Sequence, residues 1–257
     1  MRIATDSLVE DLTRRIALAL VLCLPLAATA AEPGFELEAQ TGALWFSRND
    51  VRIPGDGGTR FDMLDLTGTG PDPFLRLEGT WQFAERHAVR LAWAPVRAEG
   101  RGQFDRPVDF DGATFAAGTD VRGDYQFDTW RLTYRWTFHE SERWEWGVGA
   151  TLLVRDARIA LSQGATSASD SDLGLVPLLH VRGAWHLDDR YSVVLDIDGA
   201  AAPQGRAVDA ALLLRRQWPS GWYLSGGYRT LEGGADNDEV YTFAWQHYAV
   251  LGAGYRF

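Results

Sequence analysis

The 257-residue sequence contains no lysine, one cysteine and two methionines. All 25 basic residues are therefore arginine, whose planar guanidinium can bind a carboxylate or phosphate through two parallel hydrogen bonds. The single cysteine, Cys23, excludes an internal disulfide framework. The formal net charge of −10 argues against a nucleic-acid partner. Beyond residue 30, no apolar run approaches the roughly 18 residues that a transmembrane helix needs.

The longest apolar run, 16–26, lies near the N-terminus. Two arginines precede it, and Ala28-Thr29-Ala30 offers a cleavage site of small residues. This arrangement is typical of a secretory signal peptide, because the run is too short to cross a bilayer as a helix. We therefore expect residues 1–30 to be removed and residues 31–257 to form one mature domain without cysteine.

The apolar side chains of the mature sequence recur at every second position. In segment 130–138, every even position is apolar and every odd position is Arg or Thr. This period places each kind of side chain on one face of a β-strand. Ten segments show such alternation: 35–47, 75–83, 89–93, 130–138, 144–155, 175–186, 191–198, 208–215, 222–229 and 240–257.

The connections between these segments are alternately long and short. The short ones are 84–87, 139–143, 188–190 and 219–221, whereas 48–72, 98–121, 162–172, 202–205 and 233–239 are longer or rich in Gly and Asp. Short turns at one end and longer loops at the other are typical of bacterial transmembrane barrels.

The C-terminal segment carries the most specific pattern. Counting back from Phe257 in steps of two gives Tyr255, Ala253, Leu251 and Ala249, an apolar face that ends on two aromatic residues. It resembles the last strand of Gram-negative outer-membrane β-barrel proteins, whose terminal Phe is read by the barrel-assembly machinery. The resemblance implies a porin-like integral protein of the outer membrane, with Tyr255 and Phe257 as its assembly signal.

We therefore expect an all-β, antiparallel up-and-down transmembrane barrel of about ten strands. Pro95, just beyond segment 89–93, and Pro177, within 175–186, would each forfeit a ladder hydrogen bond in a strand, which leaves eight strands as the alternative. Rings beside the short turns, among them Trp81, Trp136 and Trp222, are expected to form an aromatic girdle at the periplasmic interface. Because every strand has a lipid-compatible face, we expect a monomer.

Charged residues occupy the face opposite the apolar one. At the membrane midplane, Arg facing lipid would cost about 2–4 kcal/mol, so this face is expected to line the lumen. A barrel of this size has little internal space, which favours a plug of interlocked salt bridges over the alternative of a narrow, anion-selective pore. The expected lumen residues are Arg76, Glu78, Arg90, Arg131, Arg135, Glu145, Arg155, Arg182, Asp196, Asp198, Asp209, Arg215 and Arg229.

Two enzyme classes supply the alternative function, because omptin-like proteases and lipid A-modifying hydrolases are also outer-membrane barrels. The local motif of neither class is found in the sequence. We interpret His180 as an interior imidazole and His247 as an interfacial side chain. No catalytic residue, metal ligand or cofactor is therefore expected.

Arginines near both long connections suggest a lipid-binding surface. Arg48, Arg52 and Arg60 lie in the first connection, and Arg97, Arg101 and Arg106 lie just beyond a strand end at the second. Guanidinium groups there could contact lipopolysaccharide phosphates, above all those of Arg97, Arg101 and Arg106. Solvated loop charge is the alternative interpretation. The sequence thus predicts a non-catalytic barrel with a structural or interaction role, or a minor narrow pore. Its expected partners are outer-membrane lipid, lipopolysaccharide and, during insertion, the barrel-assembly machinery.

Overall fold

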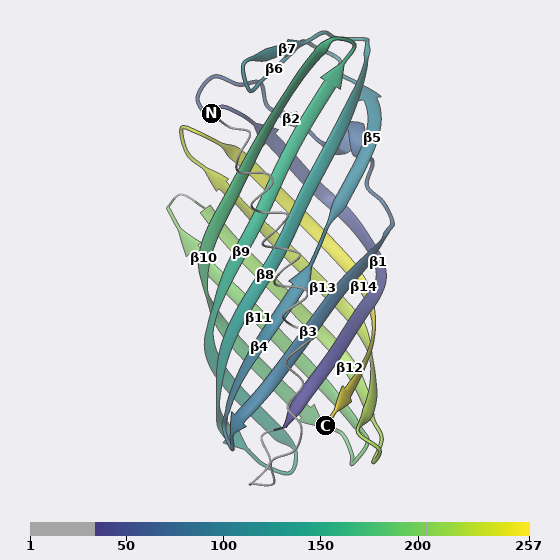
Figure 1. The fold of residues 1–257 in the computed structure, drawn as a ribbon, viewed down its shortest axis with the longest axis vertical. Helices are drawn as coiled ribbons and strands as arrows, with labels where there is room; N and C mark the ends of the chain where they lie inside the picture. The colour runs from purple at the N-terminus through teal and green to yellow at the C-terminus, as the bar shows by residue number, and fades with distance from the viewer. Residues whose placement is uncertain (1–33, 204) are drawn as a thin grey trace, which may run out of the picture. The chain divides into compact units, whose positions relative to one another are not determined.

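The computed structural model describes residues 34–203 and 205–257, so the expected signal peptide at 1–30 lies outside it. Ten long antiparallel strands of this part of the chain form a closed barrel (Figure 1). They are β1 (Phe35–Arg52), β3 (Asp72–Ala84), β4 (His87–Ala94), β8 (Asp120–Glu140), β9 (Trp144–Gln163), β10 (Thr166–His186), β11 (Tyr191–Ala202), β12 (Gly205–Gln217), β13 (Trp222–Asp236) and β14 (Tyr241–Arg256). The barrel closes because β14 pairs with β1, from Glu36 opposite Arg256 to Arg52 opposite Tyr241.

Five short elements lie in the two long connections at one end of the barrel, here called the long-loop end. They are β2 (Phe61–Asp62), α2 (Leu64–Thr67), β5 (Arg97–Gln103), β6 (Val108–Phe110) and β7 (Ala113–Phe115). β5 resumes the direction of β4 and pairs with β8, so the wall continues beyond Pro95. Among the described residues, no helix is long and apolar enough to cross a membrane.

Neither proline removes a strand, and the expectation of ten strands is confirmed over eight. Pro95 occupies the break between β4 and β5. Pro177 lies in β10 opposite Leu152, on a stretch where β10 pairs with β9 alone. The pairing of β10 with β11 begins only at Leu179, opposite Gly199. A strand edge without a second partner tolerates the missing N–H of proline.

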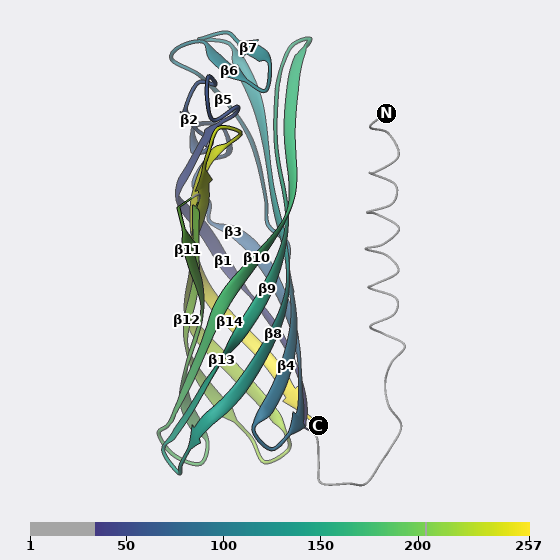
Figure 2. The same cartoon turned by 90° about the vertical axis from the view of Figure 1, so that its left-hand side faces the viewer.

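Two of the connections grouped as longer or rich in Gly and Asp, 162–172 and 233–239, consist largely of paired strand, so that expectation is wrong there. The boundaries of 202–205 agree with the structure, since β11 ends at Ala202 and β12 begins at Gly205. β9 and β10 pair as far as Gln163 opposite Thr166. They rise well beyond the ends of β11 and β12 (Figure 2). On this extension the outward residues, such as Arg158, are exposed and polar, whereas Ile159 and Leu161 on the inner face are buried in an apolar cluster, so the alternation that marks a lipid-facing strand ends there.

The outer face of the barrel is apolar between two bands of aromatic rings. At the short-turn end the rings include stacked Trp144 and Trp185, with centroids 5.5 Å apart. At the long-loop end, Trp93 lies opposite Trp130, and Trp45 stacks on His247 at 5.7 Å. On β14, the ten residue steps from Trp245 to Tyr255 cover about 33 Å of strand, or roughly 25 Å of height at a tilt near 40°. This height matches the apolar band of a membrane barrel.

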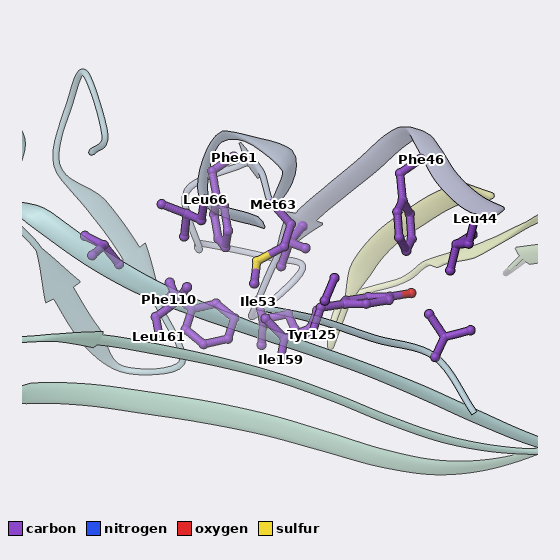
Figure 3. Packing of buried hydrophobic residues seen from close by; sticks show 14 of the residues in the cluster. Leu44, Phe46, Ile53, Phe61, Met63, Leu66, Phe110, Tyr125, Ile159 and Leu161 are labelled. Carbon is purple, nitrogen blue, oxygen red and sulfur yellow. The ribbon is translucent and has the colours of Figure 1, made fainter. Parts of the chain in front are cut away.

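The interior at the long-loop end is filled by an apolar cluster. Side chains of the first long connection, among them Met63 and Leu66, pack over Phe110, Tyr125 and other residues of the barrel wall and second connection (Figure 3). Helix α2 sits tightly on β5, because a Cβ at Gly100 would lie 2.2 Å from the carbonyl oxygen of Leu66. We call this cluster the apolar cap.

Candidate functional site

Charged side chains cross the barrel interior between the apolar cap and the short-turn end. Arg90 of β4 donates from both terminal nitrogens to Asp196 of β11, at 2.7 and 3.1 Å. Along the sheet, three strands separate β4 from β11, so this pair joins opposite walls. Arg182 adds a longer contact to Asp196 at 3.5 Å. We call these residues and their ion-paired neighbours the charge network.

Arg131 lies at the centre of the charge network. Its two terminal nitrogens contact Asp198 at 3.1 Å and Asp209 at 2.8 Å. Arg229 donates to the other oxygen of Asp209 at 2.6 Å and approaches Glu78 at 4.0 Å. Glu78 in turn pairs with Arg76. The network therefore links β3, β8, β11, β12 and β13 through alternating positive and negative groups.

A second group of contacts lies closer to the short-turn end. Arg215 of β12 contacts Glu36 at 3.1 Å and Glu38 at 3.0 Å, both on β1. The hydroxyls of Tyr223 and Ser225 donate to these glutamates at 2.7 and 2.8 Å. Neither glutamate was among the expected lumen residues. They alternate with Phe35 and Leu37, so the same period of two could have identified them.

The remaining expected lumen residues lie at the two ends of the network. Arg135 and Glu145 line a cavity of about 190 Å³ at the short-turn end. Arg155 lies towards the long-loop end and pairs with Asp172 of β10. A second cavity, of about 20 Å³ and lined in part by Arg76, Asp209 and Arg229, lies at the level of the network. That volume is roughly the space of one water molecule.

His180, Asp196 and Asp198 form a buried group with the residue types of a metal site. The His180 ring nitrogen Nδ1 lies 2.9 Å from Asp198, which also accepts from Thr151 at 2.7 Å. However, guanidinium groups already hold both carboxylates, and a divalent cation would have to displace or repel them. The arrangement fits the charge network and does not fit a cation site.

Ser47, His247 and Tyr228 form a hydrogen-bonded line on the outer face. Ser47 Oγ lies 2.8 Å from His247 Nε2, and Tyr228 Oη lies 2.5 Å from His247 Nδ1. The sequence did not reveal this contact, because Ser47 and His247 are 200 residues apart and meet only where β1 pairs with β14. A similar pair without a serine, His87 and Tyr134 at 2.7 Å, lies nearer the short-turn end.

Arg97, Arg101 and Arg106 lie on β5 and in the connection that follows it. Asp128 holds the Arg97 guanidinium, with one contact at 2.6 Å, and Arg101 lies opposite Arg122 in the pairing of β5 with β8. Arg106 donates to the backbone oxygen of Arg60 at 3.0 Å. The three arginines thus have different surroundings and do not converge on one point.

No protein-family model matches the sequence, and no curated protein matches it. Among solved structures, the outer membrane protease OmpT from Escherichia coli is similar, with a TM-score of 0.53, 10% identity and coverage of 90% of this chain and 99% of that chain. Ail of Yersinia pestis has a TM-score of 0.41 at 12% identity, covering 88% of this chain and 99% of that one. The outer membrane protein AlkL has a TM-score of 0.38 at 16% identity, covering 91% and 95%.

At these identities the similarity concerns the fold alone. This similarity in fold agrees with two features of the chain. Its ten strands form a closed sheet, and aromatic rings bound the apolar band on the outer wall. Such a wall is stable only in contact with lipid. An even number of antiparallel strands with short turns at one end is typical of transmembrane barrels of the bacterial outer membrane. The chain is an integral β-barrel protein of the bacterial outer membrane.

Proposed function

We propose that this protein is a non-conducting, non-catalytic barrel with a structural or interaction role, exerted through its outer face and loops. One observation carries the proposal: guanidinium–carboxylate contacts join opposite walls of the lumen. Arg131 of β8 reaches Asp209 of β12 at 2.8 Å, and three strands separate β8 from β12 along the sheet. A permeating solute would have to break contacts of this kind.

The apolar cap supports the same proposal from the long-loop end. Phe110, Phe115 and Met63 have no solvent exposure, although they belong to connections and not to the ten strands of the wall. Water and ions entering from that end would have to cross this packed layer. The two layers together argue against the minor narrow pore.

Anion flux into proteoliposomes tests the proposal, because surplus arginine would make any pore anion-selective. Vesicles with purified protein and an enclosed chloride-quenched dye should lose fluorescence no faster than protein-free vesicles when chloride is added outside. Faster quenching, in proportion to the protein content, would overturn the proposal. A heat-modifiable gel shift would establish that the inserted barrel is folded.

The hydrolase alternative is favoured by one specific observation, the line of Ser47, His247 and Tyr228. A nucleophile within hydrogen-bond reach of a base, with that base oriented by a third group, is the arrangement of a serine hydrolase. The similar pair of His87 and Tyr134 favours a simpler role, in which interfacial rings satisfy each other's polar atoms. Fatty-acid release from lipid in mixed micelles would distinguish the roles. Release by the wild type that is lost in Ser47→Ala would contradict the non-catalytic proposal.

Lipopolysaccharide contact through Arg97, Arg101 and Arg106 remains part of the proposal. The Arg97 side chain is 49% exposed and follows the girdle residue Trp93 by four positions, which suits the level of lipid headgroups. The triple change to Ala should lower the amount of lipopolysaccharide that co-purifies with the barrel. Unchanged co-purification would count against these contacts. We also expect a monomer, inserted by the barrel-assembly machinery.

A further inference from the structure

Four arginines, from β1, the connection after it and β12, converge on two aromatic rings on the outer face of β14. Arg52 and Arg60 lie over the Tyr241 ring, 5.1 and 4.8 Å from its centroid. Arg48 and Arg206 lie over the Phe243 ring, at 5.0 and 5.4 Å. We infer that these six side chains, the outer arginine patch, bind phosphate groups of the lipopolysaccharide in the outer leaflet.

A β-bulge in β1 is what turns the patch outward. The register with β14 shifts between Phe46 and Arg48, so Ser47 is an extra residue. Phe46, before the bulge, points into the apolar cap and is 2% exposed. Val51, after the bulge, also points into the cap and is 0% exposed. An uninterrupted strand would direct Arg48 and Arg52 into that cap, because side chains alternate strictly along a strand.

The position along β14 sets the depth of the patch. Tyr241 and Phe243 share the outer face of the strand with Trp245 and His247, which belong to the aromatic girdle at the long-loop end. Two residues correspond to roughly 5 Å of height on a tilted strand, so the two rings lie about 5–10 Å beyond the girdle. That is the level of the lipid phosphates, and the acyl chains would then lie over Trp45 and Trp245.

The carboxylates in the patch orient the arginines and leave donors free. Asp50 accepts from Arg48 Nε at 2.6 Å and from Arg60 at 2.8 Å. Glu232 holds Arg206, whereas the nearest carboxylate to Arg52 is Asp236, at 4.0 Å. Each guanidinium has five N–H donors, and these contacts use only some of them. Ring stacking and ion pairing hold the groups in place without removing their charge, which suits bidentate contact with phosphate.

This inference is independent of whether the lumen conducts, and binding measurements on the purified full barrel test it. We would compare the affinity for lipopolysaccharide with that for the same lipid after phosphatase treatment, in wild type and in the double variant Arg52→Gln, Arg206→Gln. The wild type should prefer the phosphorylated lipid by about 10-fold or more, since charge-assisted hydrogen bonds to phosphate are lost with the phosphate groups. The double variant should retain a preference of no more than about 2-fold.

The matched control is the double variant Arg190→Gln, Arg216→Gln at the short-turn end. Arg216 also lies over a ring, 4.7 Å from the Trp218 centroid, and the control removes the same charge. It should keep the wild-type preference, and a heat-modifiable gel shift should show that both variants are folded. If the double variant of the patch does not fold, Arg52→Gln alone should still lower the preference, because no carboxylate lies closer than 4.0 Å.

Three outcomes would overturn the inference. One is equal binding of phosphorylated and dephosphorylated lipid by the wild type, and another is full discrimination by the patch variant. The third is competition by inorganic phosphate at the same phosphate concentration as the lipid, because it would indicate a free-anion site and not a lipid site. We expect inorganic phosphate to compete at least about 10-fold more weakly, since it gains no contact with the girdle.

Discussion

Replacing Asp209 by Asn tests whether the charge network holds the barrel interior together. The Asp209 carboxylate is 3% exposed and contacts Arg131 at 2.8 Å and Arg229 at 2.6 Å. Asparagine keeps the shape of the side chain but removes its charge. Arg131 would then retain Asp198 as its carboxylate partner, and Arg229 would retain only the 4.0 Å contact with Glu78.

The expected loss of stability follows from burial. Removing one partner of a buried ion pair costs about 3–5 kcal/mol, because the remaining charge is left without compensation in a low-dielectric interior. Asp172→Asn is a matched control, since that carboxylate is 52% exposed and pairs with Arg155 near the surface. An exposed pair contributes about 0–1 kcal/mol, so the two substitutions should differ by at least about 2 kcal/mol.

Urea unfolding of the folded barrel in lipid vesicles, followed by tryptophan fluorescence, measures this difference. Asp209→Asn should lower the free energy of unfolding by the larger amount with little change in the slope against urea. If Asp209→Asn and Asp172→Asn were equally mild, the carboxylate would not be essential to the packing of the lumen. The argument that the network seals the interior would then fail.

Three further predictions concern the surface, the cap and assembly. Burial and neighbouring carboxylates raise the pKa of Asp170 near the tip of the β9–β10 hairpin, so its ionised form destabilises the folded barrel. Asp170→Asn should therefore stabilise the barrel at pH 7. The gain in stability should vanish below about pH 4, where the Asp170 carboxyl is protonated in both the folded and the unfolded state. A gain that persists below that pH would contradict the raised pKa as its cause. Met63→Ala should cost about 2–5 kcal/mol in urea unfolding and expose segment 53–71 to protease, since the side chain has 0% exposure; an unchanged midpoint would refute a tightly packed cap. Phe257→Ala should reduce the heat-modifiable barrel in cell membranes but not refolding of the purified protein, and equal membrane levels would argue against an assembly signal.

The strands inside the membrane could be predicted because lipid imposes a simple rule on them. Every residue of 130–138 that faces lipid must be apolar, so the period of two is nearly perfect there. The end of the β9–β10 hairpin obeys no such rule, since its outer face is polar and exposed and its inner face packs on the apolar cap through Ile159 and Leu161. Its Ser, Thr and Asp residues therefore predicted a loop, although they pair in register with β9 from Thr166 onwards.

The same alternation predicted an inward charged face, although Glu36 and Glu38 were not included in it, and it did not predict the contacts between these side chains. Arg90 and Asp196 are 106 residues apart, and they meet because the strands tilt and the sheet closes. No local pattern specifies that geometry. The bulge at Ser47 has no sequence signature either, and it alone decides that Arg48 and Arg52 face outward and that Ser47 reaches His247.

Single-channel recording tests the sealed lumen most directly. Purified barrel, shown to be folded by its gel shift, would be inserted into a planar lipid bilayer and the current measured at both polarities in molar salt. We expect a flat baseline without discrete steps, because the charge network and the apolar cap block the lumen in series. Reproducible conductance steps that scale with the amount of inserted protein would contradict this account.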